Sequence, residues 1–163
     1  MYLAGNPHLG GVKNKPRGTN LVHQNPQGFL NYLNYNKSQV KTIDLRLGFD
    51  ESSEFELIIS NYPNLKGITK GYGDIPNLIN LTKLTISNCP QLERLNIKNF
   101  QVNQFLILNN LPNLKMLVCC CNNNLTNLDL SDCVNLERIN CSENRLTEIK
   151  LPTSGGKLEE LSL

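Results

Sequence analysis

Two histidines and six cysteines are the residues of this chain best suited to carry out chemistry. His8 and His23 both lie within the segment 1–24, upstream of every cysteine. A Ser-His-Asp or Cys-His arrangement would therefore require this leader to fold back onto the rest of the chain. We accordingly expect no enzyme activity.

The densest cysteine cluster is Cys119-Cys120-Cys121. Zinc sites use spaced C-x-x-C pairs, and neighbouring residues on a strand point to opposite faces, so these three thiols do not form a ligand set. We expect no metal, a buried Cys119 and Cys141, and an exposed Cys120 that is open to oxidation.

Two other motifs suggest chemistry only superficially. The segment 152–157 resembles a phosphate-binding loop, but it lacks the leading Gly, the Ser or Thr after Lys157 and the helix that such a loop needs. The acidic pairs Asp129/Asp132 and Glu159/Glu160 are typical of solvated surfaces. We therefore expect neither a cofactor nor a small-molecule substrate.

The 163 residues suffice for one domain with a substantial core. The net charge is +2, with the basic excess confined to residues 1–46, and this balance does not indicate a nucleic-acid partner. The sequence shows neither a secretory signal nor an apolar run long enough to span a membrane. We expect a cytoplasmic or nuclear protein with free thiols, which is neither secreted nor membrane-bound.

A repeat organises the second half of the chain. Leu92, Leu114, Leu136 and Leu158 follow one another at a constant interval of about 22 residues. Further apolar positions keep the same period, namely Leu95, Leu117, Ile139 and Leu161, then Ile97, Cys119, Cys141 and Leu163. A second set lies between them, which we interpret as Leu81-Leu84-Ile86, Val102-Phe105-Ile107, Leu125-Leu128-Leu130 and Leu146-Ile149-Leu151.

Each half-unit predicts a turn followed by a short strand, because its L-x-L portion alternates apolar and polar residues. A half-unit contains too little chain for a helix of usual length as well. The sequence therefore predicts a mostly β, flattened solenoid in which two parallel sheets face each other across a leucine core. The side chains of Asn122 and Asn144 are placed to hydrogen-bond backbone groups of the turns. Cys89 and Cys133 occupy the equivalent places in other half-units.

The run Leu136–Leu151 reads L-x-x-I-x-C-x-x-N-x-L-x-x-I-x-L and resembles the short nested class of leucine-rich repeats, sometimes called IRREKO repeats. Residues 114–133 repeat it closely. The resemblance implies a right-handed solenoid with concave strands near 94–98, 116–120 and 138–142. Residues 40–45 and 65–69 resemble degenerate earlier strands, with Phe55, Leu57 and Ile59 between them, and Phe100 and Gly73 should interrupt the asparagine ladder.

The chain is expected to have three parts. Residues 1–24 form a flexible basic leader, residues 25–39 a short N-terminal cap helix that starts near Asn25-Pro26, and residues 40–163 the solenoid. We expect this solenoid to be truncated at its C-terminal side or to pair end-on with another element.

The outward positions of the concave strands form the candidate partner-binding site. They are Arg94, Asn96, Lys98, Met116, Val118, Cys120, Arg138, Asn140 and Ser142. An apolar row beside basic and amide side chains is typical of an interaction surface. The opposite sheet offers Gln104, Leu106 and Leu108 as a competing apolar row.

These features favour a non-catalytic scaffold that binds one or more proteins, as the resemblance to leucine-rich repeats implies. The first alternative is a substrate-recognition or regulatory segment of a larger signalling, kinase or ubiquitin-ligase protein. A secreted adhesin or receptor ectodomain ranks last, because it would need a signal peptide.

Overall fold

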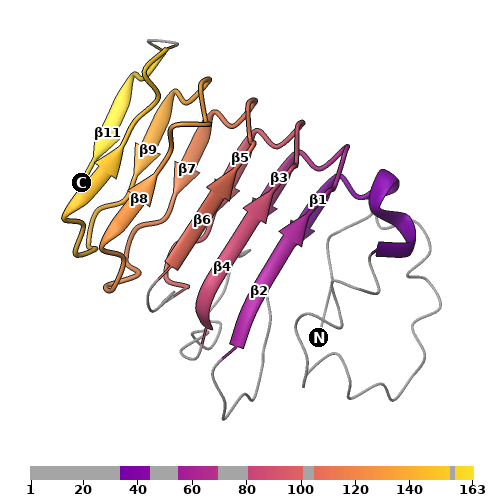
Figure 1. Ribbon diagram of the computed structural model, residues 1–163, viewed down its shortest axis with the longest axis horizontal. Coiled ribbons are helices and arrows are strands. Elements are labelled where there is room, and N and C mark those ends of the chain that lie inside the picture. The colour runs from indigo at the N-terminus through magenta and orange to yellow at the C-terminus, as the bar shows by residue number, and fades with distance from the viewer. Residues whose placement is uncertain (1–33, 45–54, 70–80, 101–104, 155–156) are drawn as a thin grey trace.

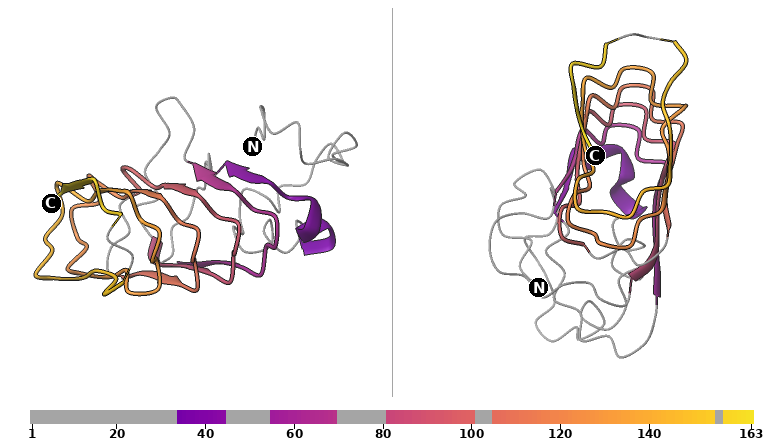
Figure 2. Two further views of the ribbon diagram at one scale, coloured as in Figure 1. Left: turned by 90° about the horizontal axis from the view of Figure 1, so that it is seen from above. Right: turned by 90° about the vertical axis from the view of Figure 1, so that its left-hand side faces the viewer.

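The computed structural model of the chain describes residues 34–44, 55–69, 81–100, 105–154 and 157–163. They form a β-solenoid of short parallel strands and flattened coils stacked along one axis (Figures 1 and 2). The strands are β1 (Thr42–Asp44), β2 (Phe55–Ser60), β3 (Gly67–Thr69), β4 (Leu81–Ser87), β5 (Arg94–Asn96), β6 (Phe105–Asn109), β7 (Met116–Val118), β8 (Asn127–Asp129), β9 (Arg138–Asn140), β10 (Glu148–Lys150) and β11 (Glu160–Ser162).

One side of the solenoid is a continuous six-stranded sheet in the order β1-β3-β5-β7-β9-β11. From β5 onward its register advances by one constant repeat, since Arg94 pairs with Met116, Met116 with Arg138 and Arg138 with Glu160. The earlier strands β1 and β3 fall where the degenerate repeats predicted them. The repeat period and the parallel solenoid inferred from sequence are therefore confirmed.

The opposite side is divided into a three-stranded sheet, β2-β4-β6, and a two-stranded sheet, β10-β8. At the ends of β2 and β4, the N–H groups of Asn61 and Asn88 donate to main-chain carbonyls of the next coil. At the end of β6, the N–H of Asn110 donates to the Asp132 carboxylate instead, at 3.3 Å. A side chain thus replaces the main-chain partner where the two sheets separate.

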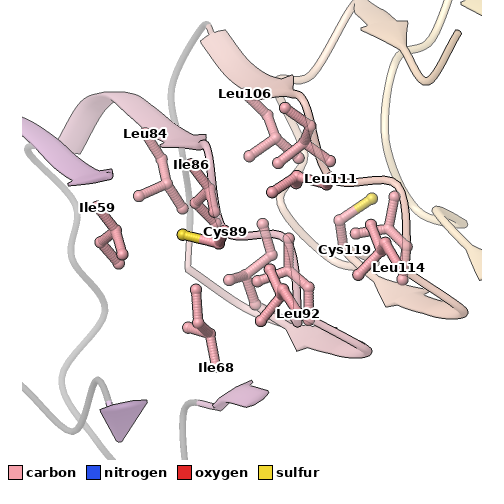
Figure 3. Close-up of a cluster of buried hydrophobic side chains, with 14 of the residues drawn as sticks. Ile59, Ile68, Leu84, Ile86, Cys89, Leu92, Leu106, Leu111, Leu114 and Cys119 are labelled. Carbon is pink, nitrogen blue, oxygen red and sulfur yellow. The ribbon is translucent and has the colours of Figure 1, made fainter. Parts of the chain in front are cut away.

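The core is a stack of leucine, isoleucine and cysteine side chains between the two sides (Figure 3). Its register-related members include Leu92, Leu114 and Leu136, and all three are buried. Burying a leucine side chain contributes roughly 1.5–3 kcal/mol, so repetition of these positions supplies much of the stability of the array. The fourth members of the three series, Leu158, Leu161 and Leu163, lie in the outermost coil and are exposed.

The interpretation of Val102-Phe105-Ile107 as a core triplet is wrong for its described members. Leu106 and Leu108 are buried, pairing in register with Leu84 and Ile86, whereas Phe105 is 56% exposed. A shift of one residue turns every side chain of a strand to the other face. The same error therefore placed Leu106 and Leu108 on the outer surface of the opposite sheet. The pairing of Leu84 with Leu106 in the structure shows the register that this strand adopts.

Asparagine side chains stabilise the turns, as predicted. Asn122 is fully buried, and its Nδ2 donates to the carbonyls of Cys119 at 2.6 Å and of Ile97 in the preceding coil at 3.2 Å. Asn144 repeats the pattern one coil later, with Cys141 at 2.8 Å and Cys119 at 3.0 Å. These bonds satisfy carbonyls that would otherwise be buried without a partner.

A second asparagine series was not anticipated from the sequence. Asn61, Asn88 and Asn110 follow the strands of the three-stranded sheet and have φ between 52° and 61°. Asn88 donates to Asn61 at 3.2 Å, and Asn110 donates to Asn88 at 2.9 Å. Asparagine suits these places because it tolerates the left-handed backbone conformation better than most residues.

The N-terminal side of the solenoid carries η2, a short 3₁₀ helix over Asn34–Gln39. Lys37 ties η2 to the first coils, because its Nζ donates to the carbonyl of Ser60 at 2.8 Å and lies 5.0 Å from the centre of the Tyr62 ring. Asn64 also donates to the carbonyl of Ser38, at 2.7 Å. The predicted leader 1–24, residues 25–33 of the predicted cap and Gly73 lie outside the described residues.

Candidate interaction face

The outward side of the six-stranded sheet, here called the long face, presents side chains in straight rows across neighbouring strands. In-register pairing places Met116 on β7 between Arg94 on β5 and Arg138 on β9. Met116 is 38% exposed, and both arginines are exposed. The structure therefore brings together the first row of the predicted site as an apolar side chain flanked by two cations.

The second row consists of Asn96, Val118 and Asn140. Asn96 Oδ1 accepts from the N–H of Lys98 at 3.2 Å, and Asn140 Oδ1 accepts from the N–H of Ser142 at the same distance. Both amides thus form turns that end their strands, a role that an Asn two residues before a turn could have indicated. Val118 is half-buried, and of this row only its side chain is apolar.

The third row follows the strand ends, and here the prediction for Cys120 is wrong. Lys98 is exposed and Ser142 half-buried, but Cys120 is only 4% exposed. Strand β7 ends at Val118, and the chain turns at Cys120-Cys121, where Cys121 has φ 62°. Because the alternation of side chains holds only within a strand, extrapolating it to Cys120 placed this thiol on the wrong side.

Three exposed cations, Arg94, Lys98 and Arg138, lie on the long face, and in-register pairing places Glu160 beside Arg138. Arg138 lies 3.9 Å from Glu159, and both side chains are more than half exposed, so this pair is worth little. Within the described part of the chain, Arg94 and Lys98 have no ion-pair partner. These cations are therefore available to an acidic ligand.

The three-stranded sheet presents a different surface. Its exposed apolar side chains are Phe105 and Ile58, and Lys83 pairs with Glu56 at 3.2 Å beside them. The competing row predicted there is wrong, because Leu106 and Leu108 point into the core. Gln104, its third member, lies outside the described residues.

The cysteines lie mainly in the core, and all six are free thiols. The prediction of a buried Cys119 and Cys141 is confirmed. A hydrogen bond with Cys141, and then burial, raise the pKa of the Cys119 thiol. Burial likewise raises the pKa of Cys133, to about 12. No group of three or more potential metal ligands occurs among the described residues.

Cys121 is therefore expected to be the only thiol that a water-soluble alkylating reagent modifies in the folded chain. Burial, followed by the hydrogen bond with Cys120, raises the pKa of Cys121 to about 11, so little reactive thiolate exists at neutral pH. Labelling followed by peptide mass spectrometry should be slow at neutral pH and accelerate as the pH approaches 11. Cys121→Ser should abolish labelling of the folded chain, and persistent modification of Cys120 would contradict the burial described above.

The remaining chemical motifs have structural roles where the structure describes them. Asp129 accepts hydrogen bonds from the hydroxyl and the N–H of Ser131, and these bonds lower the pKa of its carboxyl group. Lys157, at the end of the loop that resembles a phosphate-binding segment, donates to Asn135 Oδ1 at 2.7 Å. His8 and His23 lie outside the described residues.

Comparison with protein-family models, with curated proteins and with solved structures finds no match to this chain. Across the described residues, no helix combines the length and the apolar character needed to span a membrane.

Proposed function

We propose that this chain is a non-catalytic scaffold that binds an acidic protein segment through the long face. The observation that carries the proposal is the row Arg94–Met116–Arg138, an exposed apolar side chain between two exposed cations on three consecutive strands. Arginine and large apolar side chains dominate binding energy at protein interfaces. A sheet whose strands are fixed by the core holds such a row in place before binding, which lowers the entropic cost of association.

We further propose that the coils belong to the leucine-rich repeats and wind right-handed, in a cytoplasmic or nuclear protein. The nested L-x-x-L spacing and the asparagine bonds of Asn122 and Asn144 support the first point. Parallel crossovers are right-handed in nearly all proteins, which supports the second. The contacts of Lys37 with the first coils support an N-terminal cap that includes η2.

Affinity capture from the source cells tests the interaction face. We expect the variant Arg94→Glu, Met116→Glu, Arg138→Glu to lose specific partners that the unmodified chain retains. Reversing two central charges and burying a carboxylate should weaken binding by at least 100-fold, since each hot-spot contact is worth about 2 kcal/mol or more. All three side chains are exposed, so circular dichroism should show an unchanged fold.

The matched control is Lys83→Glu, Phe105→Glu on the three-stranded sheet, which changes a cation and an exposed apolar residue there. It should capture the same partners as the unmodified chain. Loss of partners with the control alone would move the binding surface to the three-stranded sheet. Partners that survive both variants would contradict binding through either face.

A further inference from the structure

The first outward row of the long face lacks a side chain at one place. In order along the sheet, its members are Thr42, Gly67, Arg94, Met116, Arg138 and Glu160. Gly67 on β3 therefore leaves a place one side chain wide between Thr42 and Arg94, here called the Gly67 gap. It lies on the η2 side of the row Arg94–Met116–Arg138, where β3 is the neighbour of β1 (Figure 1).

The fold does not require glycine at the Gly67 gap. Its backbone is not in the left-handed conformation that favours glycine. A methyl group in place of the α-hydrogen would lie 3.9 Å from the carbonyl oxygen of Arg94 and 3.9 Å from Cγ2 of Thr42, which are ordinary van der Waals contacts. Glycine weakens the interior of a strand, and there it often marks a site that a ligand approaches closely. A bound group therefore explains the gap better than packing does.

Three exposed cations stand around the Gly67 gap. Arg94 borders it on β5, and Lys41 and Lys66 immediately precede β1 and β3. The two lysines lie on adjacent coils, because the N–H of Lys66 donates to the carbonyl of Lys41 at 2.7 Å. Among the described residues, none of the three cations has an ion-pair partner. Like charges on neighbouring strands are unfavourable, and a bound anion would relieve this repulsion.

The acidic residue next to this cluster offsets it only in part. The N–H of Glu93 donates to the carbonyl of Lys66 at 2.9 Å, and the side chain of Glu93 is half-buried. Asp44 lies in the next row of β1, and its side chain is outside the described residues. A phosphate group carries a charge of about −1.5 to −2 and accepts paired hydrogen bonds from a guanidinium group such as that of Arg94. A phosphate monoester therefore suits the Gly67 gap better than a single carboxylate.

The spacing between the Gly67 gap and Met116 defines how one segment could occupy both. Gly67 lies on β3 and Met116 on β7, two strand spacings apart, which is about 9.6 Å. In an extended segment of polyproline II conformation, residues three apart lie on the same side, about 9.3 Å from each other. Such a segment, running across the strands, places one side chain on Met116 and a second one, three residues away, over Gly67.

We propose that the acidic segment bound by the long face carries a phosphorylated serine or threonine, and that the Gly67 gap receives its phosphate group. Arg94, Lys66 and Lys41 bind the phosphate, and an apolar side chain three residues away contacts Met116. The proposal rests on the proposed function, because it assigns the ligand of the same face. Phosphorylation of the partner then strengthens its binding to this chain.

Fluorescence anisotropy of the full chain with labelled peptide pools tests this proposal. Each pool consists of aspartate and glutamate with one leucine, and with one phosphoserine two, three, four or five residues to either side of it. A reference pool carries glutamate in place of phosphoserine. A phosphoserine three residues from the leucine should bind about tenfold more tightly than the reference pool, as expected for one additional charge-assisted hydrogen bond. The other spacings should bind less tightly than this one.

Gly67→Val fills the gap with a side chain that suits a strand. This variant should bind the phosphoserine pools no better than the reference pool, with its affinity for the reference pool unchanged. Its melting temperature should not fall, since the fold does not require the glycine. The matched control is Thr85→Val, which places the same side chain on an outward position of β4 and should keep the preference for phosphoserine.

Lys66→Gln should reduce the preference for phosphoserine severalfold, because it removes one of the three cations. Its control is Lys83→Gln, which removes a lysine from the outer side of the three-stranded sheet and should leave the preference unchanged. Inorganic phosphate at the concentration of the peptide should not displace the preferred pool, since the phosphate is held together with the rest of the segment.

Several results would overturn the proposal. They are equal binding of phosphoserine and reference pools, no binding of any pool, a stronger preference for another spacing, a Gly67→Val variant that melts earlier or keeps the preference, and displacement by inorganic phosphate. Failure of the proposed function has a different signature. In that case the variant Arg94→Glu, Met116→Glu, Arg138→Glu would capture the same natural partners as the unmodified chain.

Discussion

Leu128→Asp is expected to unfold the solenoid. Leu128 lies on β8, pairs in register with Ile149, and is 2% exposed within the leucine core. A carboxylate there would be buried without a partner, which costs several kcal/mol, while small domains are stable by only about 5–15 kcal/mol. Circular dichroism and thermal melting should show loss of the β signal or a large drop in the melting temperature.

Thr126→Asp provides the control, because it introduces the same carboxylate two residues earlier on an exposed side chain. Its stability should stay within about 0.5 kcal/mol of the unmodified chain, as is usual for surface substitutions. A spectrum and melting curve for Leu128→Asp that match those of Thr126→Asp would contradict a single core shared by the two sides of the solenoid.

Asn122→Ala is expected to lower the free energy of unfolding by about 1–3 kcal/mol, because it leaves the buried carbonyl of Ile97 without its Nδ2 donor. The carbonyl of Cys119 loses the same donor but still accepts from Asn144 Nδ2. Urea unfolding measures the loss. Asn122→Asp keeps the shape but replaces the donor by a carboxylate that faces carbonyl oxygens, and it should destabilise at least as strongly at neutral pH.

Asn144→Ala is the comparison one coil further out. Asn144 makes equivalent bonds to Cys141 and Cys119, but it is half-buried, so water can partly replace its donor. Its loss should be smaller than that of Asn122→Ala. Equal losses for the two variants would contradict the role given to the buried amide, and so would a loss for Asn122→Ala no larger than that of an ordinary surface substitution.

The candidate site could be predicted in part. The sequence placed Arg94, Met116 and Arg138 in one row because a constant repeat period determines which residues become neighbours on adjacent strands. The residue type of Asn96 and Asn140 is compatible with a turn-forming role, but this role depends on where each strand stops, which the structure shows.

The period and chemistry of the repeat by themselves determined the parallel solenoid, its leucine core and the role of Asn122 and Asn144. They did so because stacked coils place equivalent positions of successive repeats on top of one another, so one pattern determines which residues are buried in every coil. Only the tertiary structure decided the face of Leu106, the burial of Cys120 and the break between β6 and β8. Each of these depends on one residue of register or on the exact end of a strand, and a short apolar run is compatible with either choice until the neighbouring coils fix it.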